Sequence, residues 1–362
     1  MLYFTPSSSS LGFSFASKQT IEDVINFSSE IGFGIVVLGK KVKIPINPIN
    51  YYLKMIKYWK KADIVLATYP YICRPTKDNF LRIWESNLIE KLNGNKFSIL
   101  YIADLPIEQS ISSRKVVDHK AYEIEERIFK SFYSLLVFNE NMKKEIQNNY
   151  GIDDERFVEF EILDYGVDFV PLPIKQIKRS YKIIYAGALA KNRCSWIKDL
   201  PHSDNFVYEF FGKNGEWING LNRKDIGYKG FLPPDKLSKY ASTDCHFGII
   251  VYDPAFIEYL KYVSTSKFSA YMVAGLPILY SSKYSYLSHL VNEYKVGLPI
   301  SSFDEIPKII DNLTEQEYNK IRNNCLKLGE KIRQGYFFKK AVSTDLGSER
   351  RDNMKFYLGE KV

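Results

Sequence analysis

The sequence predicts an α/β protein with two Rossmann-like domains. Short, almost continuously apolar runs alternate with helical patterns, and this series restarts after a proline-containing connector. A length of 362 residues suits two domains of ordinary size. The apolar fraction of 45% and the charged fraction of 25% are typical of globular proteins and argue against disorder or collagen-like repeats.

The first half of the chain carries the first series of strands. Continuously apolar runs are typical of parallel strands that are covered on both faces. Between the first two strands we expect a helix that Thr20 caps, with Asp23 in the reciprocal position, and that stops at Gly32. The predicted strands are Leu2–Thr5, Gly34–Leu38, Ile64–Thr68, Ser98–Ala103 and Ser134–Phe138.

The second series follows an extended connector at Val167–Arg179, where two prolines precede basic residues. We expect a first domain over 1–168, a linker over 169–180, a second domain over 181–330 and a helical tail over 331–362 that returns to the first domain. The helical pattern of Thr314–Val342 is long enough for that return. The predicted elements of the second domain are strands Lys182–Ala186, Tyr208–Phe211, Phe247–Tyr252, Pro277–Tyr280 and Val296–Ile300, and helices Asp235–Ala241 and Lys267–Ala274.

The cysteines and the apolar segments exclude several classes of protein. Four cysteines and four histidines are widely spaced and show no metal-ligand pattern, so no zinc framework is predicted. The chain opens without a basic region or a long apolar core, and no run approaches about 18 apolar residues, which argues against a signal peptide and a membrane-spanning helix. The expected location is the cytoplasm, with peripheral contact at the inner face of the cell membrane left open.

The charge balance is the unusual feature of the composition. The formal charge is +8, beside 27 Tyr, 24 Phe and 4 Trp, a combination that suits nucleic acid, an anionic membrane, or sugars and phosphates. No nucleic-acid-binding module is present, so nucleic acid is not an expected partner. Two basic and aromatic segments, Tyr51–Lys61 and Lys331–Lys340, suit either a membrane surface or ordinary outer helices.

The most informative segment for chemistry is Ser264–Tyr280. Ser264, Thr265 and Ser266 can cap a helix that begins near Lys267, whose N-terminus would offer free N–H groups to an anion such as a diphosphate. The lysine adds a full positive charge at the same point. Gly275 is expected to end the helix in a left-handed conformation. The alternative is a routine capped helix with a solvated lysine.

Two further loops of the second domain are candidates. Gly187 follows a buried strand and would let the backbone approach a ligand closely, while Lys191 and Arg193 could pair with phosphate. The loop Tyr228–Asp235 precedes a helix that Asp235 can cap, and its Phe231 could stack on a base. A plain turn and a domain-core phenylalanine are the alternatives.

In the first domain, the loop Pro6–Phe13 follows the first strand. Its Ser9, Ser10 and Gly12 suit hydrogen bonds to sugar hydroxyls or phosphate, although solvent-exposed loops have the same composition. Asp104 stands at the end of a buried strand, where a carboxylate is placed for general-base work or sugar binding, with Glu108 nearby. Helix capping and a surface ion pair are the alternatives.

The order of these motifs resembles that of GT-B glycosyltransferases. More narrowly, the chain is similar to bacterial glucosyltransferases that extend the first GlcNAc on serine-rich-repeat adhesins, and to galactofuranosyltransferase-like enzymes. The resemblance is best from Tyr185 to Val342. It rests on the Gly187 and Tyr228–Asp235 loops and, in one-letter code, on FGIIVYD from Phe247, EY from Glu258, AGLP from Ala274 and GYFFKK from Gly335, with QTIEDV from Gln19 and Ala103-Asp104 in the first domain.

The resemblance implies a UDP-sugar donor held mainly by the second domain and an acceptor bound by the first. Carried over to this chain, Lys267 would contact the diphosphate, Phe231 the uridine, and Lys191 would lie near the phosphates. The Pro6–Phe13 loop would close over the donor or acceptor. The family stabilises the departing UDP with a helix dipole and basic side chains, so no metal or other cofactor is expected, and the chain has no DxD motif.

Two departures from the wider pattern matter. The retaining families place glutamates where this chain has Ala270 and Tyr262, which favours the narrower, inverting family. The usual His-Asp pair is Ala103-Asp104 here, so Asp104 as general base is a hypothesis.

Three functions therefore remain at this stage. The leading one is transfer of a hexose from a UDP-sugar to a glycan or glycoprotein acceptor in bacterial surface glycan or adhesin biosynthesis. The second is a non-catalytic GT-B-fold partner subunit that binds glycan or protein and stabilises another transferase. The third, a UDP-sugar epimerase, needs acid and base residues that we do not find. A homo-oligomer is left open.

Overall fold

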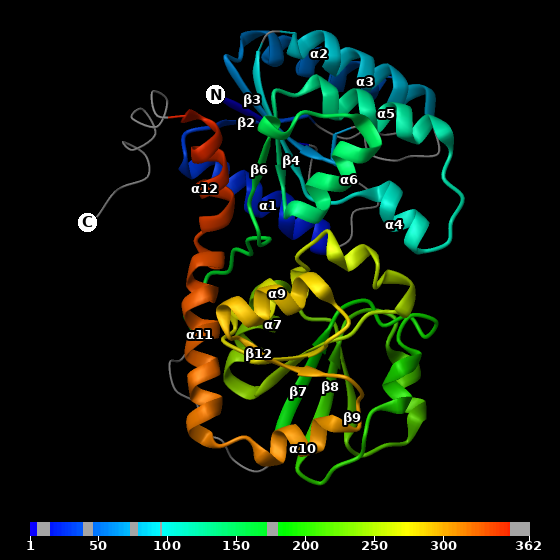
Figure 1. Ribbon diagram of the computed structural model, residues 1–362, viewed down its shortest axis with the longest axis vertical. Helices are drawn as coiled ribbons and strands as arrows, with labels where there is room; N and C mark the ends of the chain where they lie inside the picture. Colours follow the sequence, from blue (N-terminus) through cyan, green and yellow to red (C-terminus); the bar gives the residue numbers. More distant parts are fainter. Residues whose placement is uncertain (6–14, 39–45, 73–78, 95, 172–179, 348–362) are drawn as a thin grey trace, which may run out of the picture. The chain divides into compact units, whose positions relative to one another are not determined.

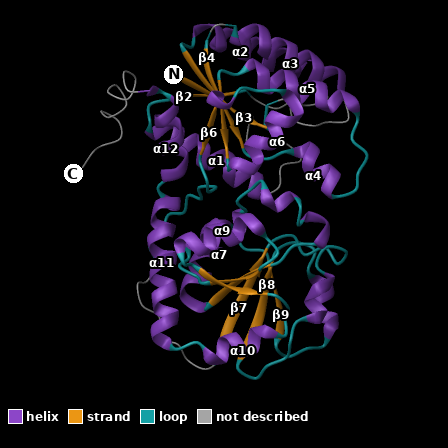
Figure 2. Cartoon of the chain, viewed as in Figure 1, coloured by secondary structure: helices purple, strands orange, loops and turns teal. Residues whose placement is uncertain are grey.

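The computed structural model describes residues 1–5, 15–38, 46–72, 79–94, 96–171 and 180–347. These residues form two compact units, each with its own sheet (Figures 1 and 2). The first unit comprises residues 1–164 together with the described residues from 335 onward, and the second comprises 165–334. Each unit is described separately below.

The sheet of the first unit is parallel throughout, as the apolar runs predict. Its strand order is β2-β1-β3-β4-β5-β6, so the order reverses between β1 and β3. Leu2–Thr5 pairs in register with Gly34–Val37 on one side. The strands are β1 (Leu2–Thr5), β2 (Gly34–Val37), β3 (Ile64–Tyr69), β4 (Phe97–Ile102), β5 (Ser134–Val137) and β6 (Phe157–Glu159).

Helices cover both faces of this sheet. In Figure 1, α2, α3 and α5 lie together on one side of the sheet, and α1 and α12 lie on the other. Gly335, with a φ of 70°, ends the preceding helix and starts α12 inside this unit. The helices are α1 (Phe15–Glu30), α2 (Ile46–Lys61), α3 (Asn79–Asn93), α4 (Pro106–Ser112), α5 (His119–Ser131), α6 (Glu140–Tyr150) and α12 (Tyr336–Asp345).

The second unit repeats the architecture. Its parallel sheet has the order β12-β11-β10-β7-β8-β9, which reverses between β7 and β10. Its strands are β7 (Tyr181–Ala186), β8 (Phe206–Phe211), β9 (Ile226–Gly230), β10 (Phe247–Ile250), β11 (Ile278–Ser281) and β12 (Gly297–Ile300). Its helices are α7 (Pro234–Asp244), α8 (Ser266–Val273), α9 (Ser285–Tyr294), α10 (Glu305–Asn312) and α11 (Glu315–Arg333).

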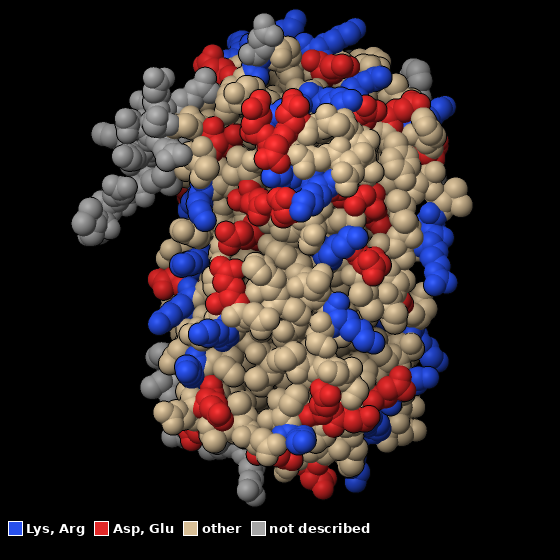
Figure 3. Space-filling view, viewed as in Figure 1, with Lys and Arg blue, Asp and Glu red and all other residues tan. Residues whose placement is uncertain are grey.

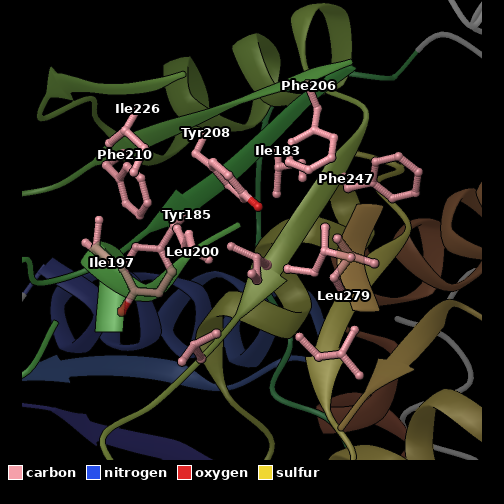
Figure 4. Close-up of a cluster of buried hydrophobic side chains, with 14 of the residues drawn as sticks. Ile183, Tyr185, Ile197, Leu200, Phe206, Tyr208, Phe210, Ile226, Phe247 and Leu279 are labelled. Carbon is pink, nitrogen blue, oxygen red and sulfur yellow. The ribbon is translucent and has the colours of Figure 1, made fainter. Parts of the chain in front are cut away.

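The core of the second unit is rich in aromatic side chains, which accounts for part of the unusual composition. Tyr185, Tyr208 and Phe210 are buried on neighbouring strands (Figure 4). Tyr185 and Phe210 have ring centroids 6.0 Å apart. Burying such rings removes large apolar areas from water, so these tyrosines serve mainly as core residues rather than as sugar-stacking surfaces.

The two basic and aromatic segments are ordinary packed helices. In α2, Met55 and Trp59 are fully buried, and the Trp59 ring lies 4.5 Å from that of Phe4 in β1. The apolar face of α2 is therefore occupied by its own unit and is not free for a membrane surface. In α12, Phe337 and Phe338 are buried in the same way.

Two lysines of the second of these segments form ion pairs. Lys339 forms an ion pair with Glu30 of α1, and Lys340 Nζ lies 3.6 Å from Glu161 Oε1. Basic and acidic side chains are interspersed on the face drawn in Figure 3, so the basic excess does not gather in one patch there. Over the described residues, no helix combines the length and apolarity that crossing a membrane requires.

Three local predictions are wrong. Thr20 does not cap a helix, because α1 already begins at Phe15 and places both Thr20 and Asp23 in its interior. Asp235 is not a cap either, since α7 begins at Pro234 and makes no side-chain cap bond. The loop predicted at Tyr228–Asp235 begins inside β9, so only its part after Gly230 is a loop.

The short strands β6 and β9 are not among the predicted strands, because each has few continuous apolar residues.

Candidate active site

The reversal of strand order between β7 and β10 locates the candidate site in the second unit. Loops that leave the carboxyl ends of parallel strands diverge where the order reverses, and ligands of doubly wound sheets bind in the space that this opens. Gly187 follows β7 at this point. The segment after β10 leads through Tyr252 to the N-terminus of α8. The strongest candidate residues of the sequence therefore lie together at the carboxyl end of this sheet.

Gly187 and Lys267 are in contact at the carboxyl end of the sheet. A Cβ on Gly187 would lie 2.9 Å from Lys267 Cε and 3.2 Å from its Nζ. The absence of a side chain at 187 thus makes room for the lysine, which is the close approach for which glycine is suited. The structure brings together two residues that the sequence singled out separately.

Two aromatic rings flank the ammonium group of Lys267. Its Nζ lies 4.2 Å from the ring centroid of Tyr252 and 5.2 Å from that of Tyr185, both within cation–π range. No carboxylate of the described residues lies within ion-pair distance of Lys267. The site therefore holds a positive charge without neutralising it.

The N-terminus of α8 completes the site. Thr265 caps the helix by accepting a hydrogen bond from the Phe268 N–H at 3.4 Å, as predicted, and Ser266 is the first helical residue. The helix therefore presents its positive end beside the ammonium group, and this arrangement attracts anions. At the other end, Gly275 has a φ of 69°, which confirms the predicted left-handed stop. These features suit a phosphate group next to Lys267.

The remaining candidates of this unit are less central. Lys191 is exposed in the turn after β7. Phe231 is 38% exposed after β9, with Lys213 Nζ 5.8 Å from its ring centroid. Contact of either residue with a ligand stays a prediction. Tyr252 is the residue that sequence reasoning missed here; its place directly after β10 was the available signal.

In the first unit, Asp104 lies just beyond the carboxyl end of β4. It is half-buried, and the Leu105 N–H donates to its Oδ1 at 3.2 Å. Loss of hydration raises the pKa of Asp104 to about 7, although the Leu105 hydrogen bond acts in the opposite direction. A carboxyl group with a pKa near neutrality can accept a proton from a bound hydroxyl and release it again.

A second carboxyl group, that of Glu125, interacts with Asp104. It lies in α5 with 2% of its surface exposed, and its Oε2 has no hydrogen-bond partner. Burial, then the negative charge of Glu108, raises the pKa of Glu125 to about 8, and Asp104 adds to this. The charge of Arg82 opposes the shift. The sequence offered no signal for Glu125, because its spacing is that of an ordinary polar helix position.

Two further expectations stay untested. Ser9, Ser10 and Gly12 lie outside the described residues. Among the residues that are described, no group of three or more histidine, cysteine, aspartate or glutamate side chains is arranged to hold a metal ion. The expected independence from metal ions stays a prediction.

Two doubly wound parallel sheets in sequence define a GT-B fold, the fold predicted above. Solved structures that share the fold include sucrose-phosphate synthase from Thermosynechococcus elongatus, with a TM-score of 0.63 and 9% identity over 98% of this chain and 99% of that chain. T4 phage BGT, solved in complex with UDP and Mn²⁺, gives a TM-score of 0.54 and 12% identity over 96% of this chain and 100% of that one. At these identities the likeness concerns the fold alone.

Comparisons of the sequence with known proteins identify relatives among the glycosyltransferases. Residues 183–344 match the family model of the glucosyltransferase 3-like, C-terminal domain. The chain is 26% identical to β-1,6-galactofuranosyltransferase WbbI of Escherichia coli K12 over 52% of its length, and 28% identical to glucosyltransferase 3 of Streptococcus gordonii over 47%. These matches confirm the resemblance noted from the sequence. The aligned region spans about half the length of these curated relatives, 56% and 50% respectively.

Proposed function

We propose that this protein is a glycosyltransferase that moves a hexose from a UDP-sugar to a glycan or glycoprotein acceptor in bacterial surface glycan or adhesin biosynthesis. The curated relatives are named as a galactofuranosyltransferase and a glucosyltransferase, and T4 phage BGT, which shares the fold, was solved with UDP and Mn²⁺. The observation that carries the proposal is the contact of Gly187 with Lys267 at the N-terminus of α8. It combines a full charge, a helix dipole and a close backbone approach, which are the features that a diphosphate needs.

In the proposed reaction Asp104 is the general base and Lys267 stabilises the leaving group. Asp104 takes the proton from an acceptor hydroxyl, and the acceptor oxygen attacks the anomeric carbon of the sugar. The bond between that carbon and the β-phosphate oxygen breaks, and its electron pair leaves with UDP. Lys267 and the N–H groups at the start of α8 stabilise the negative charge on the departing diphosphate. Attack from the face opposite the leaving group inverts the anomeric configuration.

The proposal assigns charge stabilisation to this chain's own groups and requires no metal ion. The positive charge of Lys267 is available because two aromatic rings, rather than a carboxylate, hold it. The experiment that tests this point is a comparison of UDP-sugar turnover in the presence of EDTA and of added Mn²⁺. Equal rates are expected, and turnover that depends on the added ion would contradict this part of the proposal.

A donor screen by thermal unfolding tests the function as a whole. Stabilisation by a ligand grows with its concentration over its dissociation constant, so UDP-glucose, UDP-galactose, UDP-galactofuranose, UDP-GlcNAc and UDP can be ranked directly. We expect one UDP-sugar to stabilise the protein and to release UDP when a glycan acceptor is added. Stabilisation by UDP without any turnover would favour the non-catalytic partner subunit instead. No stabilisation by any of the five compounds would contradict the proposed function.

A further inference from the structure

Tyr252, whose ring lies nearest to Lys267, has its backbone hydrogen-bonded to a second tyrosine. We propose that Tyr252 is a positioning residue: its backbone is held by the hydroxyl of Tyr284, and its ring aims the Lys267 ammonium group at the donor diphosphate. This inference rests on the proposed function, because it assigns a role in binding the same donor.

The hydroxyl of Tyr284 forms hydrogen bonds with both the N–H and the carbonyl group of Tyr252. The Tyr252 N–H donates to the Tyr284 hydroxyl oxygen at 2.8 Å, and the Tyr284 O–H reaches the Tyr252 carbonyl oxygen at 3.4 Å. Tyr284 is 3% exposed and occupies the N-cap position of α9. Burial raises the pKa of Tyr284 to about 12, so the phenol keeps its proton at neutral pH and can serve both bonds.

A small cavity lies against the segment after β10. It is lined by Tyr252, Tyr284, Ser264, Thr265 and the aliphatic side chains Leu260, Val263, Leu287 and Leu290. The Ser264 Oγ at this cavity is buried and has no hydrogen-bond partner. The two hydrogen bonds of Tyr284 therefore anchor the Tyr252 backbone beside this cavity.

The rings of Tyr252 and Tyr185 together form an aromatic cradle for the Lys267 ammonium group. Such a cradle suits an anion-binding lysine better than an ion pair does. The face of a ring attracts an ammonium group without cancelling its charge. The ammonium group has three N–H donors, so those directed away from the ring remain available to phosphate oxygens. A lysine that is ordered before the ligand arrives loses less side-chain entropy on binding. Gly187 leaves room for the end of the lysine side chain on the adjoining side.

The cradle can be tested without a ligand. Ring currents from Tyr252 and Tyr185 shift the NMR signals of the Lys267 ε-methylene upfield, and selective ¹³C labelling of lysine makes them visible. We expect the full shift in the wild-type protein and in Tyr252→Phe, a large reduction in Tyr252→Leu, where only the Tyr185 ring remains, and a smaller reduction in Tyr284→Phe. Tyr286→Phe, which removes a phenol hydroxyl from the same helix, is the matched control and should keep the shift. Equal shifts in all variants would overturn the inference.

Nucleotide binding then tests what the cradle does. Calorimetric titration with UDP and with uridine, which lacks phosphates, separates positioning from general damage to the fold. In Tyr252→Leu we expect UDP affinity to fall about tenfold and uridine affinity to change less than about twofold. Tyr252→Phe should restore UDP affinity. An equal loss of both ligands would overturn this inference alone, whereas a wild-type protein that does not bind UDP would overturn the proposed function as well.

Discussion

The space that Gly187 leaves empty is occupied by the end of the Lys267 side chain. Gly187 lies in the loop after β7 and Lys267 in the first turn of α8, and a Cβ at 187 would lie 2.9 Å from Lys267 Cε. This contact is the centre of the account, because it links the glycine after β7 with the positive end of α8.

Gly187→Ala should weaken donor binding without unfolding the protein. The atom that the new methyl group meets is the far end of a flexible side chain, so the lysine moves away and the backbone does not. We expect UDP affinity to fall about tenfold, the loss typical of one displaced charge-assisted hydrogen bond. Calorimetry measures the affinity, and urea unfolding the stability. Gly220→Ala is the matched control, because a Cβ at Gly220 meets no atom within 4 Å; equal UDP binding by both variants would contradict the account.

Asp104→Asn should remove most of the turnover while leaving UDP binding intact. An amide cannot accept the acceptor's proton, and general-base catalysis contributes about a hundredfold or more to such reactions. In the wild-type protein, kcat/KM should rise with pH through about 7, following the raised pKa of Asp104. A pH–rate profile of donor turnover with saturating acceptor measures this. If the variant kept wild-type turnover, the base would have to be another residue.

The buried carboxyl of Glu125 should make the protein less stable as pH rises. Its pKa is about 8 in the folded chain and close to 4.5 when unfolded, so between these values the unfolded chain releases a proton that the folded chain keeps. The contribution to stability is therefore fully present below about pH 4.5 and is lost as pH rises toward 8. Glu125→Gln removes this dependence, so its stability relative to the wild type should increase over that range. Urea unfolding at several pH values measures the difference, and parallel curves for both proteins would contradict the assignment.

Gly329 should be the least replaceable glycine of the α8–α11 contact. A Cβ at Gly329 would lie 2.1 Å from the carbonyl oxygen of Met272, and backbone atoms on both helices cannot move aside as a side chain can. Gly329→Ala should lower the free energy of unfolding by about 2 kcal/mol, the usual scale of overpacking. Chemical denaturation measures this, again with Gly220→Ala as the neutral comparison. A change of only a few tenths of a kcal/mol would mean that the helices shift freely.

Much of the fold could be predicted from the sequence, because both sheets consist of parallel strands with strong apolar runs. Most strands start and end within two residues of their predicted bounds, and Thr265 and Gly275 delimit α8 as expected. The short edge strands β6 and β9 could not be found in this way, since they are partly exposed and lack a continuous apolar run. The start of α1 was missed because Thr20 has the form of a cap, although tertiary burial places it inside the helix.

The candidate site was predictable only in part. The sequence indicated Gly187 and Lys267 individually, since each follows a local rule about strand ends or helix starts. Their contact depends on the strand order, which brings β7 beside β10 and is not a local property. Tyr252 and Glu125 have ordinary sequence surroundings. Their importance comes from their surroundings in three dimensions, which are Lys267 for Tyr252, and burial with the nearby charge of Glu108 for Glu125.

The most direct test of the account is the release of UDP from the preferred UDP-sugar by Lys267→Ala, compared with Lys261→Ala. Lys261 is the matched control, because its Nζ also lies over a tyrosine ring, 4.9 Å from that of Tyr262, but it pairs with Glu258. We expect Lys267→Ala to lose about a hundredfold or more in kcat/KM, as expected for the loss of a charge that stabilises the leaving group. Lys261→Ala should stay within about twofold of the wild type. Wild-type turnover by Lys267→Ala would contradict the account.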